Sequence, residues 1–264
     1  LVIGQFLDAL NSGKYDLDHT ALLITQTGGG CRASNYIHML RKALEKAGLD
    51  YIPVISLSFG LEKNPGFHWT VGLIRRLIYG MMYGDLIMNV ANQVRPYEVN
   101  PGDTAAHVDH WTTELLDRFD KGDGMSRKKM RGIFDEICAD FRAIPTEGEP
   151  KVRVGVVGEI LVKFLPAANN YLVDLLESEG AEAVVPDLLD FLLYCFYNQN
   201  FKVEKLGFEK KKATTANLGI KALEWFRAPA TEAFAASKHF TPPAKIQDLG
   251  KMASDIVSLG NQTG

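Results

Sequence analysis

The residues best suited to chemistry lie in one short turn between an apolar run and an amphipathic segment. The turn consists of Gly28, Gly29, Gly30, Cys31 and Arg32. Consecutive glycines free the backbone and let a ligand approach the main-chain amides closely. The helix expected next has an N-terminus that favours an anion and biases a cysteine there towards the thiolate. That thiolate could act as a nucleophile, a metal ligand or an iron–sulfur ligand.

Several narrower interpretations of this turn fail on spacing. No Gly-Lys-Ser/Thr follows, so it is not a nucleotide phosphate loop, and the glycines do not have the dinucleotide-binding spacing. Arg32 is too close to Cys31 to close the phosphate loop of a cysteine phosphatase. The chain contains no Cys-x-x-Cys pair for zinc or dithiol chemistry. A tight structural turn with an incidental cysteine remains the alternative.

A second candidate loop follows a later apolar strand, "KVRVGVVGE". Glu159 ends this stretch, and Asn169 and Asn170 precede the next amphipathic segment. Ligands of open parallel sheets bind outside the carboxyl ends of the strands, so we expect these residues to line the same crevice as Cys31. The alternatives are that the asparagines only cap a helix and that Glu159 is a satisfied loop acid.

The elements that must position these residues predict an α/β fold. Residues 20–25 and 51–57 read as parallel strands joined by a helix, and residues 151–159 and 181–187 as a second such pair. We therefore expect two β-α-β units of Rossmann or flavodoxin-like type, with parallel sheets and with inserted and appended helices. The expected segments are 1–63 for the first α/β unit, 64–148 for a helical insertion, and 149–264 for the second unit with a helical tail.

Other residues of reactive type fit packing or surface roles. Cys138 and Cys195 lie in apolar contexts and are expected in the core, where cysteine packs as a small hydrophobe. His107, His110 and Glu114 share a helix face that we expect to be exposed, without a metal. The basic run 210–212 is expected at a solvated helix end or in a loop.

Composition limits the class of protein. The 264 residues are 46% hydrophobic and 23% charged, and 29 basic against 32 acidic side chains give a net charge of −3. This balance gives no sign of a nucleic-acid or membrane-surface partner, and no stretch reaches the ~18 apolar residues of a membrane span. Three unpatterned cysteines argue against a secreted disulfide framework, so a cytoplasmic protein is expected. The ends of the sequence read as cuts in a longer polypeptide.

Four long stretches carry a resemblance to a known family. They are "ITQTGGGCRASNYIHMLRKALEKAGLDYIPVISL", "GFHWTVGLIRRLIYGMMYGDLIMNVANQVRPYEVNPG", "VGVVGEILVKFLPAANNYLVDLLESEGAEAVVPDLLDFLLYCFYNQN" and "SDIVSLGNQTG". Together they resemble the C-terminal region of large proteins labelled predicted CoA-substrate-specific enzyme activases, which are related to 2-hydroxyglutaryl-CoA dehydratase. The chain is similar to the dehydratase component (component D) of that superfamily and not to the ATPase component.

The resemblance implies a [4Fe–4S] protein of anaerobic bacteria. An ATPase activase, in the same or a partner chain, would pass an electron to a cluster used in acyl-CoA dehydration or reduction. Such clusters take cysteines from separate loops, and Cys31 matches a loop of that kind. Gly28, Gly29, Gly30, Arg32, Glu159, Asn169 and Asn170 are the cofactor-binding residues expected around it. The remaining ligands are expected beyond the end of this sequence, which leaves the cluster incomplete in this piece. A non-catalytic scaffold that docks the activase, or an anion- or CoA-binding module, is the rival prediction.

Overall fold

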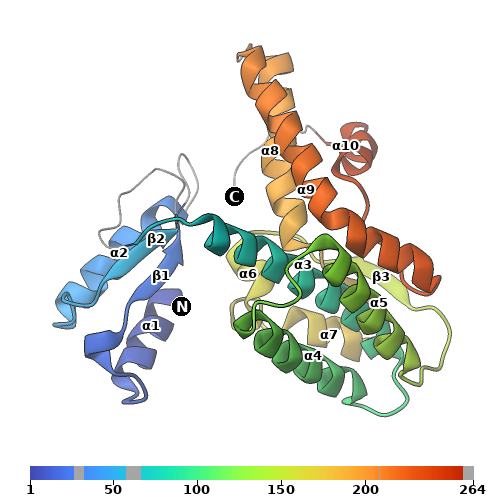
Figure 1. Cartoon of the computed structure of the whole chain (residues 1–264), viewed down its shortest axis with the longest axis horizontal. Helices are drawn as coiled ribbons and strands as arrows, with labels where there is room; N and C mark the ends of the chain where they lie inside the picture. The colour runs from blue at the N-terminus through green and yellow to red at the C-terminus, as the bar shows by residue number, and fades with distance from the viewer. Residues whose placement is uncertain (27–32, 58–66, 208, 258–264) are drawn as a thin grey trace. The chain divides into compact units, whose positions relative to one another are not determined.

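The protein is a mixed α/β chain with short parallel strands and many helices (Figure 1). The computed structural model describes residues 1–26, 33–57, 67–207 and 209–257. The chain divides into two compact units, residues 1–70 and 71–262. The elements of the first unit are α1 (Val2–Asn11), η1 (Leu17–His19), β1 (Leu22–Thr25), α2 (Ala33–Lys46) and β2 (Val54–Leu57).

The first unit is a β-α-β arrangement with one additional helix. Strands β1 and β2 run parallel with Leu22 opposite Val54, as the apolar runs predict. Helix α2 turns Ile37, Leu40 and Leu44 inward, and each is at most 1% exposed. Their three- and four-residue spacing puts them on one helix face, which packs with α1 and the strands into a small core.

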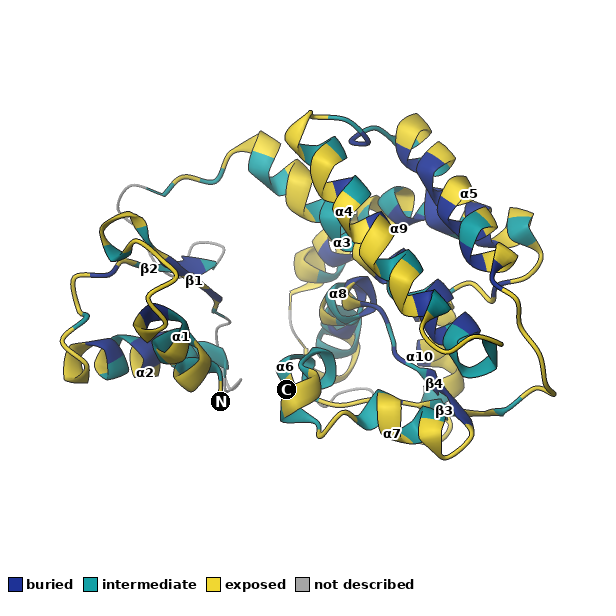
Figure 2. Cartoon of the chain, turned by 90° about the horizontal axis from the view of Figure 1, so that it is seen from below, coloured by how far each residue is buried: buried dark blue, intermediate teal, exposed yellow. Residues whose placement is uncertain are grey.

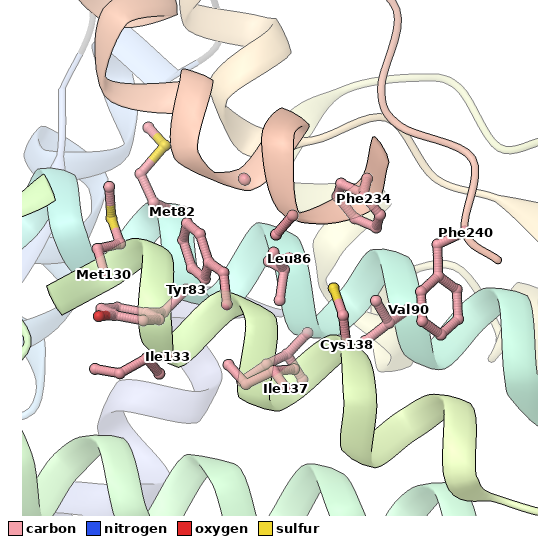
Figure 3. Packing of buried hydrophobic residues seen from close by; sticks show 14 of the residues in the cluster. Met82, Tyr83, Leu86, Val90, Met130, Ile133, Ile137, Cys138, Phe234 and Phe240 are labelled. Carbon is pink, nitrogen blue, oxygen red and sulfur yellow. The ribbon is translucent and has the colours of Figure 1, made fainter. Parts of the chain in front are cut away.

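The second unit contains the larger core. Its elements are α3 (Val71–Val94), η2 (Arg95–Tyr97), α4 (Asp103–Asp120), α5 (Arg127–Ala143), β3 (Val152–Gly155), α6 (Ile160–Phe164), η3 (Pro166–Ala168), α7 (Leu172–Ser178), β4 (Ala181–Val184), α8 (Leu188–Leu206), α9 (Lys210–Ser237) and α10 (Ile246–Ser254). Buried positions follow one side of α5, whose other side is exposed (Figure 2). They pack against α3 and α9, where Leu86, Ile137 and Phe234 meet (Figure 3).

One glycine in this core is required by its surroundings. The Tyr83 hydroxyl donates a hydrogen bond of 2.9 Å to the carbonyl of Gly124. Gly124 has a φ of +76°, and a Cβ there would lie 3.2 Å from the Tyr83 oxygen and 3.3 Å from Ile133 Cδ1. The turn between α4 and α5 therefore needs glycine for both its backbone conformation and its close approach to the core.

Strands β3 and β4 form the second parallel pair, with Arg153 opposite Glu182. Ala183 of β4 packs with Val156 and Val185 beneath α7, and α3 also contacts β4. Helices α8 and α9 then form a hairpin (Figure 1), whose turn includes Gly207 in the left-handed conformation with φ +70°.

The expected fold class is confirmed at its coarser level. Both expected strand pairs are parallel, and helices lie between them and after them. Within the described residues each sheet contains two strands, which is fewer than a complete Rossmann sheet has. Helices α3, α4 and α5 belong to the same compact unit as β3 and β4.

Candidate functional site

The Gly-rich segment follows β1 in the sequence. Gly28, Gly29, Gly30, Cys31 and Arg32 lie outside the described residues, so their predicted roles stay predictions. On either side of this segment, β1 ends at Thr25 and α2 begins at Ala33. Beside this edge the buried Ser56 hydroxyl of β2 donates a hydrogen bond of 2.6 Å to Gln26 Oε1. This bond joins the two strand ends where the ligand of a parallel sheet is expected.

Glu159 lies at the carboxyl end of β3, as expected from its sequence context. It is the N-cap of α6, and its Oε2 accepts a hydrogen bond of 3.0 Å from the main-chain N–H of Val162. This contact satisfies one of the amides that the start of a helix leaves without a partner. The side chain is half-buried, and its ligand-binding role stays a prediction.

Asn169 connects the end of α6 to the start of α7. Its Nδ2 donates to the carbonyl oxygens of Val162 and Lys163 at 2.9 and 3.2 Å. Its Oδ1 accepts from the N–H of Leu172 at 3.1 Å. One amide therefore serves both helix ends, as the capping alternative predicts. Glu159 and Asn169 are thus brought together around α6.

We expect Asn169→Ala to lower the free energy of unfolding by about 1 kcal/mol, as the loss of a helix cap does. The midpoint of urea unfolding measures this change. Asn100→Ala is the matched control, because the Asn100 amide meets only the exposed Asp103 carboxylate in the described contacts. Equal losses in the two variants would contradict a capping role for Asn169.

Asn170 and Tyr171 form a backbone irregularity in the same loop. Both have positive φ values, 57° and 55°, and neither is glycine. Asparagine tolerates this conformation, whereas an aromatic residue adopts it at a cost of about 1 kcal/mol or more. Tyr171 is 57% exposed, so core packing does not explain its conformation. The loop that carries Asn170 therefore contains two consecutive non-glycine residues in the left-handed conformation. A ligand contact by Asn170 stays a prediction.

Sequence reasoning missed a buried group of charged side chains at the N-terminus of α8. Asp85 of α3 accepts hydrogen bonds from the N–H groups of Leu188 and Leu189, at 2.9 and 3.0 Å. It therefore caps the N-terminus of α8 from another helix. Asp187 precedes the same helix and accepts a hydrogen bond from the side chain of Asn89.

Two cations partly compensate these acids. Arg227 of α9 is 3% exposed and donates through Nη1 to Asp190 at 2.6 Å, and it also binds Glu224. Lys163 of α6 donates to the carbonyl of Pro186 at 2.8 Å and lies near all three aspartates. We call Asp85, Asp187, Asp190, Lys163 and Arg227 the buried charge cluster.

Burial dominates the protonation of this cluster. It raises the pKa of Asp187 to about 8, with the charges of Asp85 and Asp190 adding to the effect. Burial also raises the pKa of Asp85 to about 6, although the two main-chain N–H groups oppose the shift. It likewise lowers the pKa of Lys163. The carboxyl groups outnumber the cations, so the neutral form of Asp187 relieves the excess negative charge.

The cluster has no space for a substrate. The cavity beside Asp85, Asp187 and Arg227 has a volume of about 10 Å³. This is at most the space of one water molecule. Shifted carboxyl pKa values mark functional sites and buried ion networks alike, and the lack of space favours a structural role. A sequence signal did exist, because Asp85 and Asp190 each interrupt an apolar run.

The two described cysteines have different environments. Cys138 is 2% exposed between α3 and α9 (Figure 3), as predicted, and burial raises the pKa of its thiol to about 12. Cys195 was expected in the core, and that prediction is wrong: the residue is exposed on α8. It lines a cavity of about 520 Å³ together with Phe196 and Thr215. Residues of α8 and α9 line this cavity, so Cys195 lies at an open space although the surrounding run is apolar.

We expect iodoacetamide to modify Cys195 in the folded protein within minutes and Cys138 only after unfolding. The reason is that the reagent attacks an accessible thiolate, and Cys138 is both buried and held protonated. Peptide-resolved mass spectrometry measures the two adducts separately. Rapid native modification of Cys138 would contradict its placement in the core.

The histidine-bearing face of α4 is only partly exposed. His110 faces solvent as expected, whereas His107 is partly buried and its Nδ1 lies 2.7 Å from Asp140 Oδ2. Trp111 Nε1 donates to the same carboxylate oxygen at 2.8 Å. Asp140 therefore joins α4 to α5. The basic residues 210–212 lie exposed in the first turn of α9, as predicted.

The described residues do not by themselves fit a [4Fe–4S] cluster. Such a cluster takes about four cysteine ligands. Among the described residues no three His, Cys, Asp or Glu side chains are grouped as a metal site would require. Cys138 is too buried to contribute, and Cys195 is a single accessible thiol. A cluster would need Cys31 together with ligands from outside the described part of the chain.

Comparisons with protein-family models, with curated proteins and with solved structures gave no match. Within the described ranges, no helix has the length and apolar character needed to cross a membrane.

Proposed function

We propose that this chain is part of an iron–sulfur protein related to the 2-hydroxyacyl-CoA dehydratases and their CoA-substrate-specific activases. In this proposal Cys31 is one ligand of a [4Fe–4S] centre whose other ligands come from elsewhere in the full-length protein or its partner. Gly28, Gly29, Gly30 and Arg32 are the cofactor-binding residues proposed beside Cys31 in the sequence, and Glu159, Asn169 and Asn170 are proposed as further cofactor-binding residues. The two strand pairs would be the cores of two Rossmann or flavodoxin-like units.

One observation carries the proposal: β1, the strand that precedes the Gly-rich segment in the sequence, runs parallel to β2, and the hydrogen bond between Ser56 and Gln26 joins the two strands at their carboxyl ends. Parallel sheets bind ligands at this edge. Cys138 is excluded as a ligand by its burial. Cys195 is exposed on α8, away from the carboxyl end of a strand, so Cys31 is the ligand that we propose. A [4Fe–4S] centre would supply one-electron chemistry, and the chain's own contribution would be to hold and orient one thiolate.

The proposal includes partners and a compartment. An ATPase activase domain, in the same or another chain, would deliver the electron, and an acyl-CoA would be the substrate. Oxygen-sensitive chemistry of this kind fits a cytoplasmic protein of an anaerobe. The near-neutral charge balance of 29 basic and 32 acidic residues gives no support to a nucleic-acid partner.

The test is the iron content of the full-length protein after anaerobic purification, with electron paramagnetic resonance of the reduced sample. We expect bound iron in the wild type and a substantial loss in Cys31→Ser. Cys195→Ser is the matched control, since it removes an exposed thiol of α8 and should leave the iron content unchanged.

The rival function is a non-catalytic scaffold, or an anion- or CoA-binding domain, that docks the activase part. A wild-type protein without iron would favour this rival. Iron that is retained in Cys31→Ser would remove Cys31 as a ligand and with it the central residue of the proposal.

A further inference from the structure

The second unit contains a cavity of about 480 Å³ that is lined by none of the candidate site residues described above. It lies at the amino ends of β3 and β4, whereas the predicted ligand site lies at their carboxyl ends. Four segments form it: the end of α3 with η2, the connection 146–150, the first residues of the two strands, and residues 239–241 after α9. Its volume falls in the range of about 300–1,000 Å³ that is typical of small-molecule pockets.

One wall of the cavity is a chain of hydrogen bonds that ends on an arginine. The hydroxyl of Tyr97 accepts from the N–H of Lys151 at 3.0 Å and donates to Glu182 Oε2 at 2.9 Å. The other oxygen of Glu182 accepts from Arg153 Nε at 2.9 Å. Burial raises the pKa of Tyr97, which keeps its hydroxyl protonated and able to donate. Glu182 is only 9% exposed, so Arg153 is held by a buried carboxylate.

The opposite wall, residues 239–241, is hydrogen-bonded to α3. Gln93 of α3 accepts from the N–H of Thr241 at 2.8 Å and donates to its carbonyl oxygen at 3.2 Å. Phe240 is buried, and the ring of His239 meets it edge to face with centroids 4.8 Å apart. The connection that forms the floor is tied down by the bond from Glu147 N to the carbonyl of Tyr97, at 2.9 Å. The cavity is therefore preformed, which reduces the cost of ordering it around a ligand.

The groups that remain for a ligand are mostly donors. Arg153 uses only its Nε, and neither Nη has a partner among the described residues. The same holds for the ring nitrogens of His239 and for the hydroxyls of Thr146 and Thr241 within the described part of the chain. The charge of Glu182 is balanced by Arg153, and the carboxylate also accepts a hydrogen bond from Tyr97, so it does not repel an anion strongly. A guanidinium that presents two Nη groups matches the oxygen pair of a carboxylate or phosphate.

We propose that this cavity binds a small organic molecule through a carboxylate or phosphate group, with Arg153 as the anion-binding residue. The Nη groups of Arg153 contact the oxyanion, His239 and the threonine hydroxyls add hydrogen bonds, and the face of Phe240 contacts the apolar part of the molecule. This inference is independent of the iron–sulfur proposal, because the two share no residue.

The test uses three probes that share one ring and differ in the polar group: phenyl phosphate, benzoate and the neutral benzamide. Titration of the folded protein is followed by amide chemical shifts in ¹H–¹⁵N NMR spectra. We expect phenyl phosphate or benzoate to shift the amides of residues 146–148 and 239–241, and benzamide to bind at least tenfold more weakly. A preference for phenyl phosphate identifies a phosphate ligand, and a preference for benzoate identifies a carboxylate.

Two substitutions with opposite expected effects on the affinity for the anionic probe test whether Arg153 binds the anion. Arg153→Gln should lower the affinity for the anionic probe at least tenfold, because a pair of charge-assisted hydrogen bonds is lost. Glu147→Gln removes an exposed negative charge at the rim of the cavity and should raise the affinity for the same probe about twofold to threefold. Arg131→Gln is the matched control, since Arg131 is an arginine paired with carboxylates on α5 and α9 and should leave the affinity unchanged.

Three outcomes would overturn the proposal. They are equal binding of benzamide and benzoate, unchanged affinity in Arg153→Gln, and weaker anion binding in Glu147→Gln. The amide spectrum of each variant without probe reports its fold. Should Arg153→Gln be unfolded, Arg153→Lys takes its place, because it keeps the charge but lacks the paired donors, and unchanged affinity there would equally contradict recognition by the guanidinium.

Discussion

Replacing Arg227 with methionine is expected to lower the free energy of unfolding by about 3–5 kcal/mol, the usual result of breaking a buried ion pair from one side. Arg227 is 3% exposed, and its Nη1 donates to Asp190 Oδ1 at 2.6 Å. Methionine fills much of the same volume but leaves the Asp190 carboxylate buried without its cation. The carboxylate can escape this cost only by taking up a proton, so the loss should be larger at high pH than at low pH.

Chemical unfolding followed by circular dichroism measures the change. Arg131→Met is the matched control: this partly exposed arginine binds Asp135 and Glu232, both at 2.9 Å, and its loss should cost less than about 1 kcal/mol. The double variant Arg227→Met/Asp190→Leu should recover most of the loss, since replacing both partners of a buried pair with apolar groups is often neutral. Equal costs for Arg227→Met and Arg131→Met would mean that Arg227 is not buried as described.

The parts of the fold that sequence predicted well are those set by local pattern. The short apolar runs before Gly28 and after Asp50 do become β1 and β2, because short runs of β-branched and other apolar side chains favour strands. In β1 the side chains of Leu22 and Ile24 are buried, whereas Leu23 is 46% exposed. The three-and-four spacing in α2 likewise puts Ile37, Leu40 and Leu44 inside. Such signals operate over a few residues, and they need no knowledge of the partner element.

The buried charge cluster was not predictable in the same way. Asp85 and the Leu188 amide that it caps are 103 residues apart, so nothing near either residue indicates the contact. An acid within an apolar run shows only that some partner is needed. The cavity beside Arg153 could not be predicted from nearby sequence either, since four separate segments form its walls. The prediction for Cys195 failed in the opposite direction: its sequence neighbours are apolar, but the residue itself is exposed and lines a cavity with residues of α9.

Asp187→Asn should make the protein more stable at neutral and alkaline pH. Burial and the neighbouring acids raise the pKa of Asp187 from 3.8 to about 8, so folding takes up a proton between these two values. The free energy of unfolding contributed by this group is therefore greatest below pH 3.8, falls as the pH rises, and levels off above about pH 8. Asparagine is neutral at every pH and escapes this loss.

The measurement is the difference in free energy of unfolding between Asp187→Asn and the wild type, recorded from pH 4 to pH 9. We expect the variant's advantage to grow with pH and to reach about 1 kcal/mol or more above pH 8, given that one pKa unit corresponds to ~1.4 kcal/mol. The Asn89 side chain can still donate to the asparagine oxygen, which preserves the contact seen with Asp187.

Asp123→Asn provides a control with the opposite sign. Its ion pair with Lys129 lowers the pKa of Asp123, so its contribution is present at neutral pH and is lost as the pH falls. This variant should therefore be less stable than the wild type at neutral pH, with the difference shrinking towards acid. A pH-independent difference for Asp187→Asn would mean that Asp187 is ionised in the fold, and that Lys163 and Arg227 compensate the cluster more fully than their contacts suggest.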